Sequence, residues 1–168
     1  MASSDADARA VRPPAAPHPS RIDVGRVVLG GLLAGLIINT GETVLNAFFL
    51  GAHYAEPMMA HGVAESPHSV AIFAVYGFLL GIVLIWLYAA MRPRFGPGPR
   101  TAAMAGLAVW FIYSGSFADF HLAVPVFPTA VPLGNLAWGF VELPLAAMAG
   151  AWVYREKEPA ASAEPTSA

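Results

Sequence analysis

The chain has 168 residues, of which 57% are hydrophobic and 12% are charged, and its net charge is −2. A soluble domain usually has ~25% charged residues, so this composition excludes a water-soluble globule and predicts an integral membrane protein. The sequence contains no cysteine, which excludes disulfides and thiolate metal sites.

Residues 1–21 are polar and proline-rich, and we predict that they form a disordered cytoplasmic tail. The first apolar segment covers about 24–50 and is long enough to cross the membrane, which takes ~20 helical residues. Its start is similar to a signal peptide. No A-x-A cleavage site follows, however, so we expect a retained span.

Three further apolar segments, at about 70–91, 101–120 and 133–154, are also of membrane-spanning length. The third span is the weakest, because SGSFAD ends its apolar run at Tyr113. Residues 156–168 are predicted to be a second disordered cytoplasmic tail. We therefore predict an all-α membrane domain over residues 22–155, with four transmembrane helices in an antiparallel bundle.

The basic residues predict the orientation of this bundle. All nine lie before or at the start of the first span, between the second and third spans, or after the fourth, whereas segments 51–69 and 121–132 contain none. Cytoplasmic loops carry an excess of Lys and Arg, so both termini are predicted to be cytoplasmic. The basic residues are Arg9, Arg12, Arg21, Arg26, Arg92, Arg94, Arg100, Arg155 and Lys157.

Each span contains small residues four positions apart, a spacing that lets helix backbones approach closely within a membrane. We favour packing inside one bundle as their role. The alternative is a seam between copies of the chain in a homo-oligomer. The predicted packing positions are Gly31 and Gly35, Gly77 and Gly81, Ala102 and Gly106, and Ala146 and Gly150.

The first span has polar residues inside an apolar run, LIINTGETVLNAFF. With ~100° of rotation per helical residue, Asn39, Glu42 and Asn46 fall in one sector of ~80°. Gly31 and Gly35 share that sector. The polar residues are therefore predicted to face the other helices rather than lipid.

Glu142 is the second carboxyl residue at membrane depth. With a rise of ~1.5 Å per residue, it lies ~18 Å from the inner end of its span, and Glu42 lies ~24 Å from the inner end of the first span. We predict that the two glutamates face each other and share a proton, with Asn39 and Asn46 as hydrogen-bonding neighbours. Pro144 is predicted to kink the fourth span and to free a backbone carbonyl nearby.

Two interpretations of this buried polar site remain open. A carboxylate at the centre of a helix costs ~2.5–3.5 kcal/mol on insertion scales, and residues of this kind often lie on proton or solute pathways. The leading hypothesis is therefore proton-linked or small-solute handling. The alternative is a non-catalytic scaffold or assembly partner, in which the hydrogen bonds only hold the helices together, at ~0.6–2 kcal/mol each.

The outer segments show no motif that defines an activity. HYAEPMMAH places Met58 and Met59 between His53 and His61, and these side chains suit copper, but the spacing matches no metal motif. SGSFADFH contains Ser, Asp and His, which occur together too often by chance to indicate catalysis. We therefore predict no enzyme, no metal, no cofactor and no nucleic-acid partner, and expect the lipid bilayer as the partner.

Three stretches carry a resemblance to known sequences: VGRVVLGGLLAGLIINTGETVLN, GIVLIWLYAAMRPRFGPGPRT and GAWVYRE. Through them, residues 22–157 resemble a family of small bacterial integral membrane proteins with four predicted spans and no established activity. The resemblance implies the four-span fold and a location in the bacterial inner membrane. It implies no catalytic role for any residue.

Overall fold

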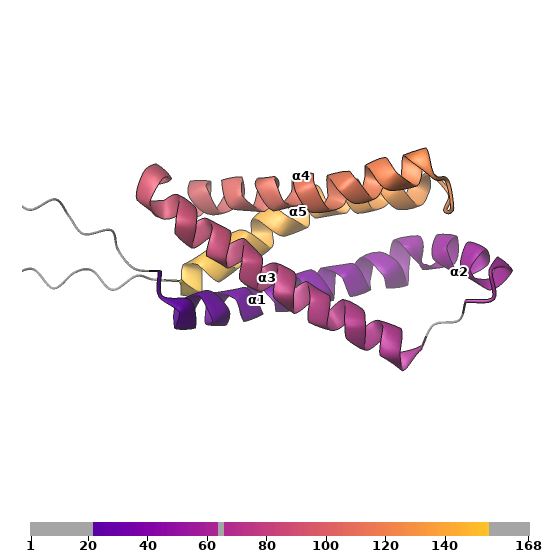
Figure 1. Ribbon diagram of the computed structural model, residues 1–168, viewed down its shortest axis with the longest axis horizontal. Helices are drawn as coiled ribbons and strands as arrows, with labels where there is room; N and C mark the ends of the chain where they lie inside the picture. Colours follow the sequence, from indigo (N-terminus) through magenta and orange to yellow (C-terminus); the bar gives the residue numbers. More distant parts are fainter. Residues whose placement is uncertain (1–21, 64–65, 155–168) are drawn as a thin grey trace, which may run out of the picture.

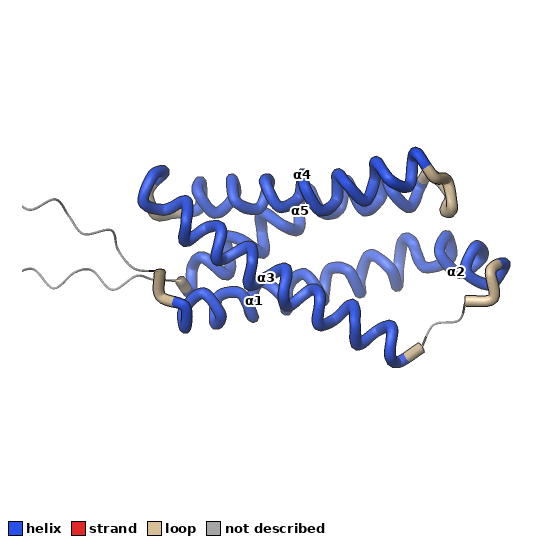
Figure 2. The backbone as a smooth tube through the Cα atoms, in the orientation of Figure 1, coloured by secondary structure: helices blue, strands red, loops and turns tan. Residues whose placement is uncertain are grey.

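The computed structural model describes residues 22–63 and 66–154, and these residues are helical apart from short loops (Figure 2). No strand occurs among them. The helices are α1 (Val24–Leu45), the π-helical turn η2 (Asn46–Leu50), α2 (Gly51–Ala60), α3 (Pro67–Phe95), α4 (Pro99–Ala123) and α5 (Ala130–Val153). The predicted tails, 1–21 and 156–168, lie outside the described residues.

Four continuous helical segments, which we call rods, are long and apolar enough to cross a membrane. The first rod, 24–60, joins α1, η2 and α2, and the others are α3 (67–95), α4 (99–123) and α5 (130–153). The predicted fold class, an all-α membrane protein with four transmembrane helices, is confirmed, and the chain is a multi-pass membrane protein. The first rod continues about ten residues beyond the predicted end at 50, through η2 into α2. The third also continues through SGSFAD to Ala123, because serine and aspartate in a helix do not break it.

Local sequence explains where the helices begin and end. Asp23 caps α1 by accepting from the backbone N–H of Arg26 at 3.1 Å, and Ser66 caps α3 by accepting from Ser69 N at 3.1 Å. The turn between α3 and α4 contains Gly96 with φ 81° and Gly98 with φ 131°, conformations that other residues rarely adopt.

The helices pack mainly as two pairs, α1 with α3 and α4 with α5, and α1 also packs on α5 (Figure 1). Glycines allow the close approach. A Cβ added at Gly35 would lie 2.7 Å from Phe78 Cα of α3, and one added at Gly106 would lie 2.5 Å from Pro144 Cα of α5. α1 and α5 also approach closely, since a Cβ added at Gly30 of α1 would lie 2.6 Å from the backbone oxygen of Gly150 of α5.

The start of α1, the α3–α4 turn and the end of α5 lie at the same end of the bundle (Figure 1). We call this the arginine end, since Arg26, Arg92, Arg94 and Arg100 all lie there. The half of the bundle nearest to it is closely packed. Several of its residues have no exposed surface: Ala34, Leu84, Ile85, Ala89, Ala102, Ala105, Ala146 and Ala147.

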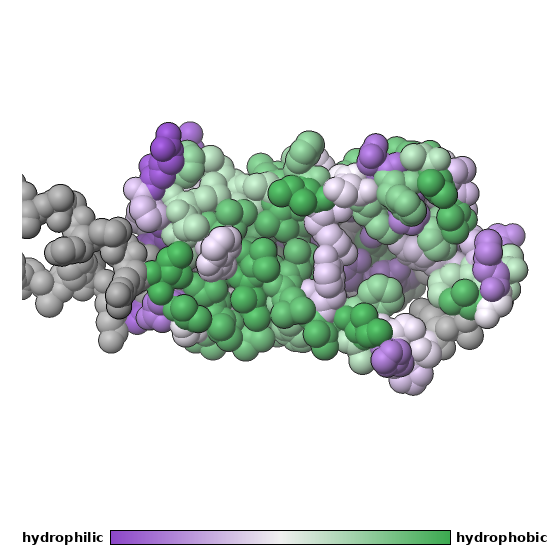
Figure 3. All heavy atoms as spheres, viewed as in Figure 1, coloured by the Kyte–Doolittle hydropathy of each residue, from purple (hydrophilic) through white to green (hydrophobic). Residues whose placement is uncertain are grey.

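The opposite half, which we call the open half, is much looser. α3 diverges from α4 toward this end (Figure 1), and no residue of α3 before Gly77 is buried. The space-filling view shows a hollow between the two helices, with hydrophilic residues at its floor (Figure 3).

The π-helical turn changes which side chains of the first rod face inward. In an uninterrupted helix Phe49, four residues after the buried Leu45, would share its face. Instead Leu50 is buried at 5% exposure and Phe49 is 61% exposed. The extra residue in the turn rotates the chain, so Leu50 contacts α5 at Gly134, where an added Cβ would lie 3.0 Å from its side chain.

Candidate functional site

Glu142 lies near the middle of α5 and its side chain is directed at α1. The residue is only 7% exposed. Its Oε1 accepts a hydrogen bond from Trp138 Nε1 at 3.2 Å, one turn earlier in the same helix. On α1 it meets Gly41, where an added Cβ would occupy the position of the Glu142 carboxyl oxygen. The absence of a side chain at position 41 thus makes room for a buried carboxyl group.

Glu42, the next residue of α1, is half-buried. It interacts electrostatically with Glu142, with Tyr113 of α4 and with Tyr54 of α2. The contacts of the described residues include no hydrogen bond between the two carboxyl groups. The structure therefore brings Glu42 and Glu142 into one polar region between α1, α4 and α5 without joining them directly.

The two asparagines do not bond to either carboxyl group. Asn39 Nδ2 donates to Gly35 O at 2.8 Å and to Ala74 O of α3 at 3.1 Å. Asn46 Nδ2 donates to the backbone oxygen of Glu42 at 2.8 Å. Asn39 thus binds α1 to α3, and Asn46 bonds within the first rod at the start of the π-helical turn.

Sequence reasoning missed the rest of this polar region. Asn135 of α5 donates to the Tyr54 hydroxyl at 3.0 Å, which ties α2 to α5. The Tyr113 ring lies 5.9 Å from that of Tyr76, so α3 and α4 are in contact at this point. Only the pairing of Asn135 with Glu142, seven residues apart on one helix face, could have suggested part of this set from the sequence.

The predicted packing positions lie at several different contacts. Gly31 and Gly35 face α3, where Gly81 meets both of them, and Gly77 meets Asn39. Gly106 faces Pro144, and Gly150 faces Gly30 and Ile85. Pro144 lies inside α5, whose last part runs at an angle to the part beside α4 (Figure 1).

The other candidate clusters do not assemble into a recognisable site. Among the residues that the structure describes, no group of three or more His, Asp or Glu side chains could hold a metal ion. His121 Nδ1 donates to Phe117 O at 2.8 Å and its ring stacks on Phe127. Ser114 packs against Gly139 of α5, where an added Cβ would lie 2.5 Å from its Oγ.

Comparison with known proteins gives one finding about function. The chain is 32% identical over 119 residues to a protein of Methanocaldococcus jannaschii named "Putative ABC transporter permease protein", and the match covers 62% of this chain. It covers only 33% of that protein, so this chain corresponds to about a third of its length. No family model matches the chain, and no solved structure is significantly similar to it. The similarity agrees with a membrane protein and does not establish a family.

Proposed function

We propose that this protein handles a small solute in a cell membrane, in exchange or together with protons, at the polar region around Glu42 and Glu142. The observation that carries the proposal is Glu142 itself. It is a carboxyl residue with 7% exposure near the middle of a membrane-spanning helix, and a second carboxyl group interacts with it electrostatically. Ionisable side chains at this depth are costly and commonly mark ion or solute pathways.

The similarity to a permease also supports solute handling. The match covers only about a third of that longer protein, so its whole activity is not assigned to this chain. The arginine end is proposed to be cytoplasmic by the positive-inside rule, in a bacterial inner membrane. The solute then reaches the site from the open half. Because the other half is closely packed, passage to the cytoplasm requires a change of helix packing or a second copy of the chain.

Proton movement into vesicles tests the proposal. The purified protein is reconstituted into liposomes that contain a pH-sensitive dye, and a potassium diffusion potential drives protons inward. The wild type should acidify the lumen, and Glu42→Gln and Glu142→Gln should each reduce the rate to that of empty liposomes. Glu56→Gln is the matched control, since Glu56 is exposed on α2. Equal rates for all three variants would refute a role of the pair in proton movement.

A scaffold role for the same residues makes a different prediction. If the polar region only stabilises the bundle, Glu42→Leu and Glu142→Leu should each lower the free energy of unfolding, and the double variant should recover part of that loss. Glu42→Gln, which can still donate and accept, should then leave both the stability and any measured flux unchanged.

A further inference from the structure

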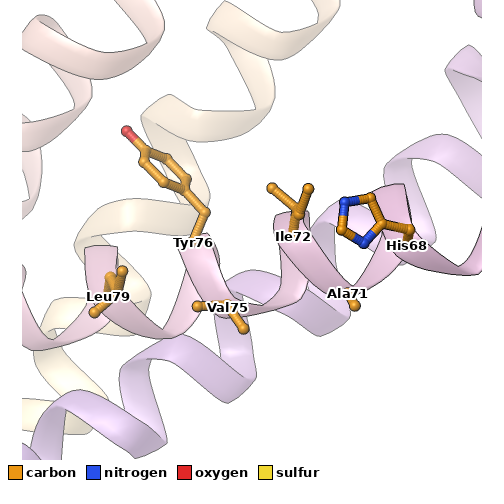
Figure 4. A pocket seen from close by; sticks show the side chains of 6 residues that line it. All are labelled: His68, Ala71, Ile72, Val75, Tyr76 and Leu79. Carbon is orange, nitrogen blue, oxygen red and sulfur yellow. The ribbon is translucent and has the colours of Figure 1, made fainter.

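The open half contains an apolar groove that the proposed function does not use. It has a volume of about 370 Å³ and is lined by His68, Ala71, Ile72, Val75, Tyr76 and Leu79 of α3 (Figure 4). These residues follow one face of the helix from position 68 to position 79, which is eleven steps of ~1.5 Å or roughly 16 Å. One leaflet of a bilayer has a hydrocarbon thickness of about 15 Å, so the groove is as long as a leaflet is deep.

One end of this groove adjoins the polar region. In Figure 4, Tyr76 points away from α3 toward the neighbouring helices, and its ring lies 5.9 Å from that of Tyr113. Tyr113 in turn interacts electrostatically with Glu42. The groove therefore adjoins the polar region through the contact between the Tyr76 and Tyr113 rings.

The hollow opens sideways into the bilayer. Both helices that flank it carry exposed apolar side chains, with Ile72 of α3 at 53% exposure and Phe111 and Ile112 of α4 at 72% and 69%. Such surfaces in a membrane-spanning helix face lipid tails. A ligand with an alkyl chain can enter from the leaflet along this route, whereas a fully hydrophilic solute cannot.

The charge of the polar region around Glu42 and Glu142 favours a cationic head group. Among the described residues, no hydrogen bond is made to the Glu42 carboxyl group, and the Glu142 carboxyl group accepts one, at Oε1 from Trp138. All described Lys and Arg residues lie at the arginine end. Tyr113 and Trp138 add aromatic faces, which attract cations by ~0.5–2 kcal/mol. An ammonium group would neutralise the carboxyl groups and donate hydrogen bonds to them.

We propose that the hollow between α3 and α4 binds a single-chain alkylamine that enters from the bilayer, with its ammonium group at Glu42 and Glu142 and its chain in the α3 groove. This rests on the proposed function and names the class of its substrate. A second copy of the chain is a poorer occupant, because its apolar face would bury the carboxyl groups without a partner.

Photolabelling in nanodiscs tests the proposal. The probe is dodecylamine with a diazirine in its chain, and the alcohol and the fatty acid with the same diazirine are controls. The amine should label α3 within residues 68–79 at least tenfold more than either control. Unlabelled dodecylamine should compete. Glu42→Gln and Glu142→Gln should each reduce labelling to the level of the alcohol, whereas Glu56→Gln should not.

A groove variant covers the case in which the glutamate variants fail to fold. Ile72 is lipid-exposed, so Ile72→Trp should fold and should obstruct the chain position, and amine labelling should fall about tenfold. Equal labelling by all three head groups, labelling that survives Ile72→Trp, or cross-links to a second copy would each overturn the proposal. If proton movement needs both glutamates but the amine shows no preference, only this inference fails. If the amine binds selectively and no proton movement occurs, only the proton-linked function fails.

Discussion

At the scale of single residues, Gly41 determines the geometry of the candidate site. The Glu142 side chain occupies the place that a side chain at position 41 would need. Trp138 then holds the carboxyl group in that place by donating to Oε1. The site thus depends on one residue that carries no chemistry of its own.

Gly41→Ala is expected to displace the Glu142 carboxyl group and to lower the free energy of unfolding by ~1–3 kcal/mol, the cost of disrupting a buried polar group. Titration with SDS, followed by circular dichroism, measures the change. Gly115→Ala is the matched control, because no atom lies within 4 Å of an added Cβ there. It should be neutral or stabilise by up to ~1 kcal/mol through helix propensity. If both variants behave alike, position 41 does not shape the site.

Sequence reasoning named both glutamates and both asparagines and paired them with one another, whereas the asparagines donate to backbone oxygens instead. A helical wheel places residues on one helix and cannot say which neighbour faces which sector. The stripe that holds Gly31, Gly35 and Asn39 faces α3, and α5 is met instead by Gly30 and Gly41. The shared proton between Glu42 and Glu142 stays a prediction.

At the scale of helices, the number and nature of the spans followed from the sequence because ~20 apolar residues can only cross a membrane as a helix. The end of the first rod did not follow. Hydropathy falls after Leu50, but the backbone stays helical to Ala60, and the bond from Asn135 to Tyr54 ties that extension to α5. Such a contact between distant positions leaves no local signal in the sequence.

Gly35→Leu is expected to push α1 and α3 apart where Gly35 contacts Phe78. An added Cβ would lie 2.7 Å from Phe78 Cα, and backbone atoms cannot move away as a side chain can. We expect a loss of ~1–3 kcal/mol, as for overpacked cores. The same substitution at Gly115 meets open space and should cost much less in the same SDS titration. Equal losses would show that contact with α3 at Gly35 does not stabilise the bundle.

At the scale of the whole molecule, the two halves of the bundle differ in packing and polarity. The half at the arginine end has an apolar core without exposed surface, and the open half has a polar floor and apolar rims. If a ligand binds at Glu142 as proposed, we expect the closely packed half to separate it from one side of the membrane, so that it enters from the other side or from lipid.

Reporter fusions test which end of the bundle is cytoplasmic. Fusions after Arg100 and after Lys157 are expected to report a cytoplasmic location, and fusions after Ala60 and after Pro128 an external one, because the basic residues gather at one end. Alkaline phosphatase and green fluorescent protein give opposite signals for the two sides. An external signal after Arg100 would invert the proposed orientation, and with it the direction in which the hollow opens.

The π-helical turn at 46–50 also affects how this sequence can be compared with distant relatives. Because each of its hydrogen bonds spans five residues instead of four, the turn accommodates one more residue than an α-helical turn does. From Gly51 onward, the side chains therefore point in the directions that they would have in an uninterrupted α-helix with one residue fewer in this segment. A homologue with a one-residue gap here would keep Tyr54 and Leu50 on the same faces. A gap inside the first transmembrane helix is thus compatible with this fold, although it would ordinarily count against common ancestry.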